Sequence, residues 1–127
     1  MSKVVLDASA LLAVLHGEPG AARVTEHLAD AVMSAVNVAE AGARLVDRGM
    51  PPPLVGEAMR ALGVDIAPFD AELAQVSTAL RQGTRPFGLS LGDRACLALA
   101  QKLGVPAVTA DRAWSNLNLS ISVTLIR

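Results

Sequence analysis

Aromatic residues are nearly absent from this sequence. Two phenylalanines, one tryptophan and no tyrosine amount to 2% of the chain, whereas apolar residues as a whole make up 52%. The core must therefore be built from alanine, leucine and valine, with Phe69, Phe87 and Trp114 as its only large rings. Such small side chains suit helices that lie tightly on a sheet. They also leave few rings for stacking on nucleic-acid bases, and Trp114 fits either that role or a place in the core.

Cysteine is scarcer still, because Cys96 is the only one. A single cysteine excludes an internal disulfide and is typical of a reducing compartment, most simply the cytoplasm. The two histidines, His16 and His27, lie in the first predicted helices, and we assign them no catalytic role.

A strong charge of one sign and a long apolar run are also missing. The net charge of −1 argues against a basic surface that coats nucleic acid non-specifically. Nine of the eleven basic residues are arginine, the better ligand for phosphate, so a local nucleic-acid site stays open. Charges or prolines interrupt every hydrophobic stretch and no signal peptide is evident, so we expect a soluble protein without a membrane partner. The 127 residues fit one domain, 1–127, with a sizeable core.

What the sequence does contain is a regular alternation of short apolar runs and helical segments. The runs that read as strands are 3–7, 31–35, 64–67, 106–110 and 122–126. Helices are predicted over 8–15, 21–29, 37–49 with Asn37 as the N-cap, 54–62, 70–81 and 91–103, with a helical turn or two at 112–117 and a mobile-looking loop at 83–88. This alternation predicts an α/β fold in which helices cover both faces of a mostly parallel sheet.

The most informative stretch runs from Leu89 to Arg112. Ser90 is a good N-cap residue, and Asp93 stands at the third helical position, so a helix should begin at Leu91. Gly104 and Pro106 end that helix, a valine-rich strand follows, and Asp111 comes directly after the strand. The stretch is half of a helix-then-parallel-strand unit with one acid at the helix start and another beyond the strand.

Four acids share one edge of the predicted sheet: Asp7, Glu40, Asp93 and Asp111. Each alone has an ordinary structural explanation as a helix cap, and Glu40 could pair with Arg44 one turn later. In an open parallel sheet, however, ligands bind beyond the carboxyl ends of the strands, where all four belong. Asp70 also follows a strand and opens a helix, so this logic alone does not separate it from the others.

If these carboxylates converge, they need a cation or a proton. Two carboxylates about 4 Å apart repel by roughly 4 kcal/mol at an effective dielectric constant near 20. Hard oxygen ligands without histidine or a second cysteine indicate Mg²⁺ or Mn²⁺ rather than zinc.

The motifs together resemble a PIN-domain ribonuclease, and more narrowly the VapC-type toxins of bacterial toxin–antitoxin pairs. The resemblance rests on Val-Val-Leu-Asp7-Ala-Ser9, Asn37-Val-Ala-Glu40, Ser90-Leu-Gly-Asp93 before an alanine-rich helix, and Val-Thr109-Ala-Asp111-Arg112. It covers essentially the whole chain in order and length. It implies a PIN-like fold, cleavage of RNA with Mg²⁺ or Mn²⁺, a cognate VapB-like antitoxin and a homodimer.

The resemblance also implies residue roles. Asp7, Glu40, Asp93 and Asp111 would be the catalytic, metal-binding quartet, with Ser9 and Thr109 supporting it, while Asp70 has no counterpart and remains a helix cap. The family often places another acid or asparagine soon after the last aspartate. Here Ala113 and Trp114 follow and Asn116 comes later, so the number of metals stays open. Arginines nearest the predicted site are candidates for contacts with the RNA backbone: Arg85, Arg94 and Arg112.

Two other interpretations stay open on the residues alone. A haloacid-dehalogenase-like phosphatase would use an aspartate after the first strand as nucleophile, but it normally has a second aspartate two positions on, where Ser9 stands. A non-catalytic acidic α/β module would only bind a partner. Apolar residues that could serve a partner, or else the core, are Leu11, Leu12, Val55 and Met59.

Overall fold

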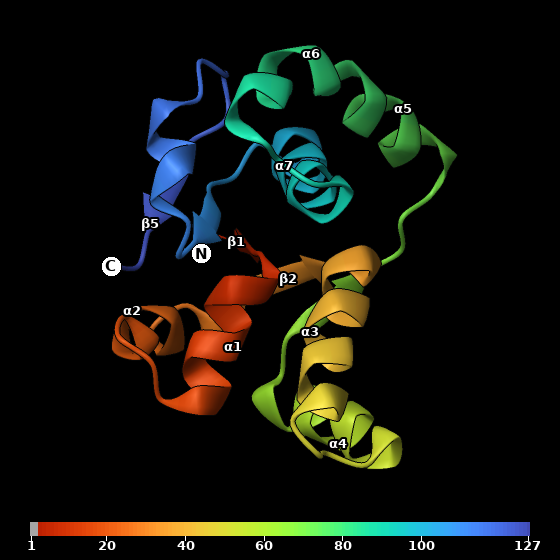
Figure 1. The fold of residues 1–127 in the computed structure, drawn as a ribbon, viewed down its shortest axis with the longest axis vertical. Helices are drawn as coiled ribbons and strands as arrows, with labels where there is room; N and C mark the ends of the chain where they lie inside the picture. The colour runs from red at the N-terminus through yellow and green to blue at the C-terminus, as the bar shows by residue number, and fades with distance from the viewer. Residues whose placement is uncertain (1–2) are drawn as a thin grey trace.

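Five short parallel strands form the centre of the fold, which we describe for residues 3–127 of a computed structural model (Figure 1). The strands are β1 (Val4–Leu6), β2 (Ala31–Ser34), β3 (Asp65–Ala67), β4 (Ala107–Thr109) and β5 (Val123–Leu125). Their order in the sheet is β3-β2-β1-β4-β5, and every neighbouring pair is parallel. The chain moves outward from β1 to β3 and then restarts on the other side of β1. The switch point of the sheet therefore lies between β1 and β4.

Helices cover both faces of this sheet, as the sequence predicts. They are α1 (Ala8–His16), α2 (Ala21–Thr25), α3 (Ala35–Asp47), α4 (Pro52–Leu62), α5 (Ala71–Ala79), α6 (Arg81–Thr84) and α7 (Leu91–Leu103). Short 3-10 turns span Leu28–Asp30, Arg85–Phe87 and Arg112–Asn116. In Figure 1 the helices α1 to α4 lie below the strands and α5 to α7 lie above them. The predicted α/β class and two-sided cover are confirmed.

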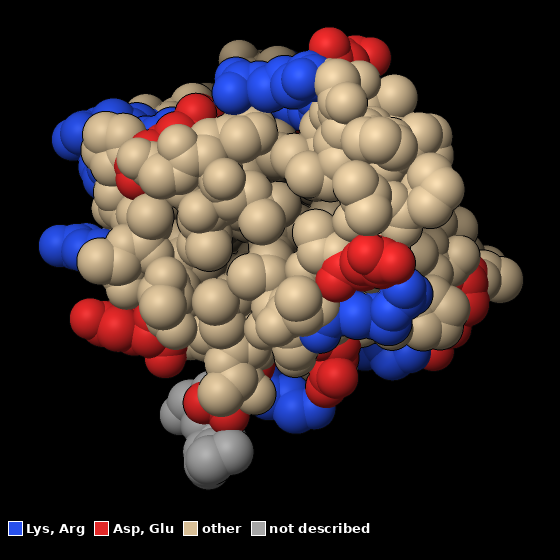
Figure 2. All heavy atoms as spheres, turned by 90° about the horizontal axis from the view of Figure 1, so that it is seen from below, with Lys and Arg blue, Asp and Glu red and all other residues tan. Residues whose placement is uncertain are grey.

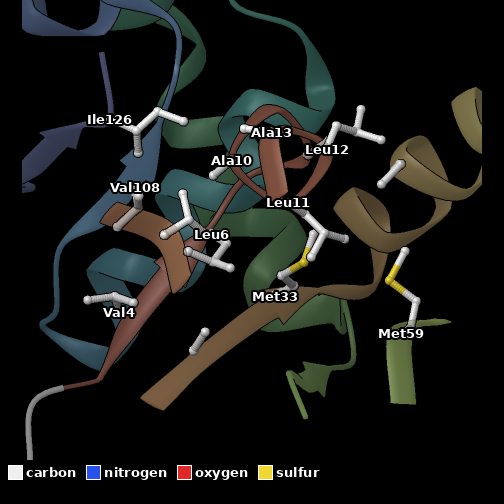
Figure 3. Packing of buried hydrophobic residues seen from close by; sticks show 14 of the residues in the cluster. Val4, Leu6, Ala10, Leu11, Leu12, Ala13, Met33, Met59, Val108 and Ile126 are labelled. Carbon is white, nitrogen blue, oxygen red and sulfur yellow. The ribbon is translucent and has the colours of Figure 1, made fainter. Parts of the chain in front are cut away.

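The period of two along each strand divides the core into two halves. Val4 and Leu6 pack with α1 on one face, while Val5 between them packs with α7 on the other. Figure 3 shows the first half, where strand residues meet the small side chains Ala10 and Ala13 of α1. Leu11, Leu12 and Met59 lie in this half with exposures of 5% or less, so they are core residues rather than a partner surface.

The rings that the sequence contains do not all enter the core. Trp114 is 1% exposed and packs with the α7 half, which decides for the core interpretation and against stacking on a base. Phe87 is 38% exposed.

Helix α4 begins at Pro52, two residues before its predicted start, and three further predictions were wrong for local reasons. The helix predicted to start after Asn37 begins three residues earlier, because Ser34 ends β2 and its Oγ accepts the Val36 N–H at 3.2 Å. The helix predicted over 21–29 stops at Thr25 and continues as the 3-10 turn Leu28–Asp30. The expected loop at 83–88 is helical, with α6 and the turn Arg85–Phe87 ending at Gly88 in the left-handed region.

The charges on the surface are of both signs. Seen from below, the molecule shows a broad uncharged face with acidic and basic side chains interspersed around its margins (Figure 2). Across residues 3–127, no helix is long and apolar enough to cross a bilayer.

Candidate active site

The four predicted acids line one pocket beyond the carboxyl ends of the strands. The pocket has a volume of about 240 Å³, and its wall is formed by Asp7, Ala8, Ser9, Glu40, Arg44, Ser90, Asp93 and Asp111. Asp7 follows β1 and Asp111 follows β4, so the pocket sits at the switch point of the sheet. Asp70 caps α5 through the Leu73 N–H at 3.0 Å and does not line the pocket.

Three of the acids cap helices and line the pocket at the same time. Asp7 Oδ1 accepts the Ala10 N–H at 2.8 Å at the start of α1. Asp93 forms a capping box with Ser90 at the start of α7, and Asp111 Oδ1 accepts the Ala113 N–H at 3.0 Å. Capping and convergence are therefore compatible, because the helix starts themselves meet at this edge of the sheet.

Asp7 is the most buried of the acids, with an exposure of 4%. The pKa of Asp7 is raised from 3.8 to about 6. Burial is the main cause and the nearby charge of Asp93 adds to it, while hydrogen bonds from Thr109, Ser9 and the Ala10 backbone act in the opposite direction. Without a cation, Asp7 is therefore about half protonated near pH 6.

The two predicted supporting hydroxyls hold Asp7 from both sides. Ser9 Oγ donates to Asp7 Oδ1 at 2.7 Å, and Thr109 Oγ1 donates to Asp7 Oδ2. Each hydroxyl also accepts a backbone N–H of the chain after β4, Ser9 from Ala110 at 2.9 Å and Thr109 from Asp111 at 3.0 Å. Ser9 and Thr109 thus connect β1, α1 and the segment after β4 into one hydrogen-bonded unit.

Glu40 reaches the pocket from the second turn of α3 and is positioned by Asn37. The buried Asn37 Nδ2 donates to Glu40 Oε1 and to the Gly92 carbonyl, both at 3.0 Å. The prediction of Asn37 as a cap is wrong, since the side chain faces inward and joins α3 to α7. Its Oδ1 is buried without a hydrogen-bond partner among the described residues.

Sequence reasoning missed two further residues of the site. A Cβ on Gly92 would overlap the Glu40 carboxylate, so any other residue at this position would displace that carboxylate from its place in the pocket. Arg44 lines the pocket, and no Glu40–Arg44 ion pair is present in the described part of the chain. Gly92 is part of the Ser-Leu-Gly-Asp motif, but a glycine inside a predicted helix does not indicate which side chain packs against it.

The predicted RNA-contacting arginines do not line this pocket. Arg94 Nη1 donates to the Ser77 carbonyl on α5 at 3.4 Å, and its Nε is buried. Arg85 and Arg112 are exposed at the starts of the turns Arg85–Phe87 and Arg112–Asn116.

Cys96 lies beneath the carboxylates, one turn along α7 from Asp93. Burial raises the pKa of its thiol well above the ordinary value, and the charges of Asp7, Asp93 and Glu40 add to this. The thiol therefore stays protonated and is not a nucleophile.

The donor chemistry of the pocket suits a hard divalent cation. All of its acidic groups are oxygen donors, and neither histidine nor cysteine lines it. Among residues 3–127, no three acidic, histidine or cysteine side chains form a ready-made cage around one point. An open wall of carboxylates fits Mg²⁺, which keeps several waters and binds through one or two carboxylates.

Comparison with known proteins agrees with this architecture. The structure resembles one chain of a toxin–antitoxin complex from Klebsiella pneumoniae, with a TM-score of 0.77, 20% identity and 98% of each chain covered. It also resembles DNA-bound VapBC from Salmonella typhimurium (TM-score 0.75, 14% identity, 100% of each chain). A third similar structure is the sarcin–ricin-loop-cleaving toxin VapC20 of Mycobacterium tuberculosis (TM-score 0.72, 15% identity, 91% of this chain and 96% of that one).

At these identities, the likeness to solved structures establishes the fold alone. No curated protein matches the sequence significantly. A family model described as "PIN domain" matches residues 4–118, a span that contains all four acids of the pocket. With the sheet order, the switch-point pocket and this match in agreement, the chain belongs to the PIN domain family.

Proposed function

We propose that this protein is a Mg²⁺- or Mn²⁺-dependent endoribonuclease that hydrolyses RNA phosphodiester bonds. The observation that carries the proposal is the lining of one switch-point pocket by Asp7, Glu40, Asp93 and Asp111. Capping a helix does not require these acids to lie in one pocket, whereas binding one cation together does. The PIN domain match supports a nuclease over the haloacid-dehalogenase-like alternative and over a module that only binds a partner.

A divalent cation held by these carboxylates would act as a Lewis acid toward the phosphate that is cleaved. Around it, Ser9 and Thr109 keep Asp7 oriented, and the cation would favour the ionised form of Asp7 over the protonated one. Asn37 donates to Glu40 Oε1, and no residue of the described part of the chain bonds to Oε2, so Oε2 would be able to accept a proton from an attacking water. The water oxygen would bond to phosphorus as one ester P–O bond breaks, and the leaving oxygen would take up a proton from solvent, so that one end carries a phosphate and the other a hydroxyl.

The activity is tested by incubating the chain with total RNA and Mg²⁺, with and without EDTA, and mapping the cut ends. Asp93→Asn should abolish cleavage and preserve the fold, because asparagine can still accept the Ser90 N–H of the capping box while it removes the charge. Asp70→Asn, a cap outside the pocket, is the matched control and should cut like wild type. If Asp93→Asn cuts as fast as wild type, Asp93 is only a cap.

We further propose that the chain acts in the cytoplasm as a toxin restrained by a VapB-like antitoxin. The proposal is supported by the similarity of the fold to solved toxin–antitoxin proteins. Val46 and Leu54 on the adjacent helices α3 and α4 are also 40% and 47% exposed, so they could contact a partner. A homodimer is part of the same proposal. Induction in a bacterial host should arrest growth with the wild-type chain and not with Asp93→Asn, and light scattering of the purified chain gives its oligomeric state.

A further inference from the structure

A second pocket lies beside the acidic one and carries the opposite charge. It has a volume of about 150 Å³, and its charged or titratable lining residues are His16, Glu18, Arg44, Arg48 and Arg127. Ser9 and Arg44 line both pockets, so the two hollows adjoin along the groove between α1 and α3. Three arginines and one glutamate line the second pocket.

The arginines of this second pocket are not equally free. Arg127 donates to the Pro19 carbonyl at 2.7 Å and lies 3.9 Å from Glu18, so it is engaged within the chain. In the described part of the chain, Arg44 and Arg48 form no ion pair, and both are exposed. These two guanidinium groups are therefore available to an anion from solution.

Their spacing follows the axis of α3 away from the acidic pocket. Glu40, Arg44 and Arg48 are separated by four residues each, which is about 6 Å of rise per step, and all three stand on the same side of the helix. A row that begins with a carboxylate at the cation site and continues with two guanidinium groups matches a chain of phosphates. One phosphate would lie at the cation and the following ones beside the arginines.

The ordinary explanation of these residues is weaker. Arg48 at the C-cap of α3 does complement the helix dipole, and Arg44 stands in the last turns of the same helix. Complementing the helix dipole does not require these arginines to line a pocket shared with α1. It also does not require the Arg44 guanidinium to line the pocket of the four carboxylates. Exposed arginines placed for solubility alone have no reason to adjoin the acidic pocket.

We propose that the pocket formed by Arg44 and Arg48 binds the phosphates of the RNA strand next to the bond that is cleaved. This inference rests on the proposed ribonuclease function and places the RNA backbone in the groove between α1 and α3. It assigns backbone binding to Arg44 of α3 and Arg48 at its C-cap rather than to Arg85, Arg94 and Arg112.

The test measures binding without cleavage. A fluorescent single-stranded oligoribonucleotide is titrated with the full chain carrying Asp93→Asn, over a series of salt concentrations. Adding Arg48→Gln should weaken binding about tenfold at low salt and lower the slope of log K against log salt by about 0.7, the value for one lost phosphate contact. Arg44→Gln should act in the same direction. Arg60→Gln, an equal loss of charge on the exposed face of α4, should leave affinity and slope unchanged.

Two results would overturn the proposal. One is that Arg48→Gln and Arg60→Gln bind the oligoribonucleotide equally well. The other is that Arg48→Gln weakens binding of an acidic peptide of similar charge but not of the oligoribonucleotide, which would make the pocket a protein-binding site. Cleavage of RNA by the wild-type chain is measured separately. If the wild type cleaves RNA but binding does not depend on Arg48, this inference fails and the ribonuclease proposal stands. If binding depends on Arg48 but the wild type does not cleave RNA, the ribonuclease proposal fails and the binding site stands.

Discussion

The carboxylate of Glu40 occupies the space that a side chain on Gly92 would need. Helix α7 starts with a glycine at its second position, and the absent Cβ lets a residue of α3 reach the pocket between them. Asn37 strengthens the contact, because one amide group donates to both Glu40 and the Gly92 carbonyl. The site thus depends on a glycine that has no chemistry of its own.

Gly92→Ala should abolish or strongly reduce RNA cleavage without unfolding the protein. The added methyl group displaces the Glu40 carboxylate, whereas helix propensity alone would favour alanine by about 1 kcal/mol. Cleavage assays and thermal melts measure the two effects. Gly56→Ala in α4 is the control, since its Cβ would meet only the flexible end of Arg60 at 3.5 Å and should keep full activity. Full activity of Gly92→Ala would show that RNA cleavage does not depend on the present position of the Glu40 carboxylate.

Thr109→Val should destabilise the fold by about 2 kcal/mol and reduce cleavage. The variant keeps the shape of the buried side chain but removes the donor to Asp7 and the acceptor of the Asp111 N–H. Urea unfolding gives the free energy. Thr109→Ser retains the hydroxyl and should recover most of the loss, while Thr78→Val at an exposed position of α5 should change stability by less than about 0.5 kcal/mol. Equal effects of the two valine substitutions would contradict the role assigned to Thr109.

Asp7 should make the cation-free protein less stable as the pH rises from about 4 to about 6. Its pKa is higher in the folded chain than the value of 3.8 expected when unfolded, so the folded state binds the proton more tightly. The stabilising effect of that proton is complete below the unfolded pKa and is lost as the pH passes through about 6, a change of about 3 kcal/mol. Melts of wild type and Asp7→Asn in EDTA should converge near pH 4, and Asp7→Asn should melt higher at pH 7. A constant difference across this range would contradict the assignment.

Mn²⁺ or Mg²⁺ should raise the melting temperature of the wild-type chain. A ligand that binds only the folded state stabilises it by about 2.7 kcal/mol at a hundredfold excess over its dissociation constant. Asp7→Asn should gain less, and Asp70→Asn should gain as much as wild type because Asp70 lies outside the pocket. A wild type that is indifferent to both ions, together with an Asp7→Asn that melts lower in EDTA, would show four separate caps rather than one site.

Much of the architecture was predictable from local patterns. The start of α7 at Leu91 and its end at Leu103 follow from Ser90, Asp93 and Gly104, and the observed capping box agrees with them. Buried strands read as apolar runs, and alternation with helices implied parallel pairing. The positions of Asp7 and Asp111 after strands predicted their shared edge of the sheet. The helix ends and the strand runs depend on neighbouring residues only, so periodicity and capping rules describe them well, and the shared edge follows from the general rules for parallel sheets.

The remaining features needed the tertiary structure, because they join residues far apart in the chain. Asn37 had the sequence of a cap, yet Ser34 caps α3 and Asn37 turns inward to reach Gly92, 55 positions away. The four-residue spacing of Glu40 and Arg44 predicted an ion pair on the surface of a helix. In the structure α3 packs beside α1, and Arg44 instead lines both pockets. Phe87 and Trp114 were equal candidates for the core, and only packing separated them. Local sequence thus determined which residues begin and end each element, whereas the close approach of α3, α7 and the switch point decided which side chains share a site.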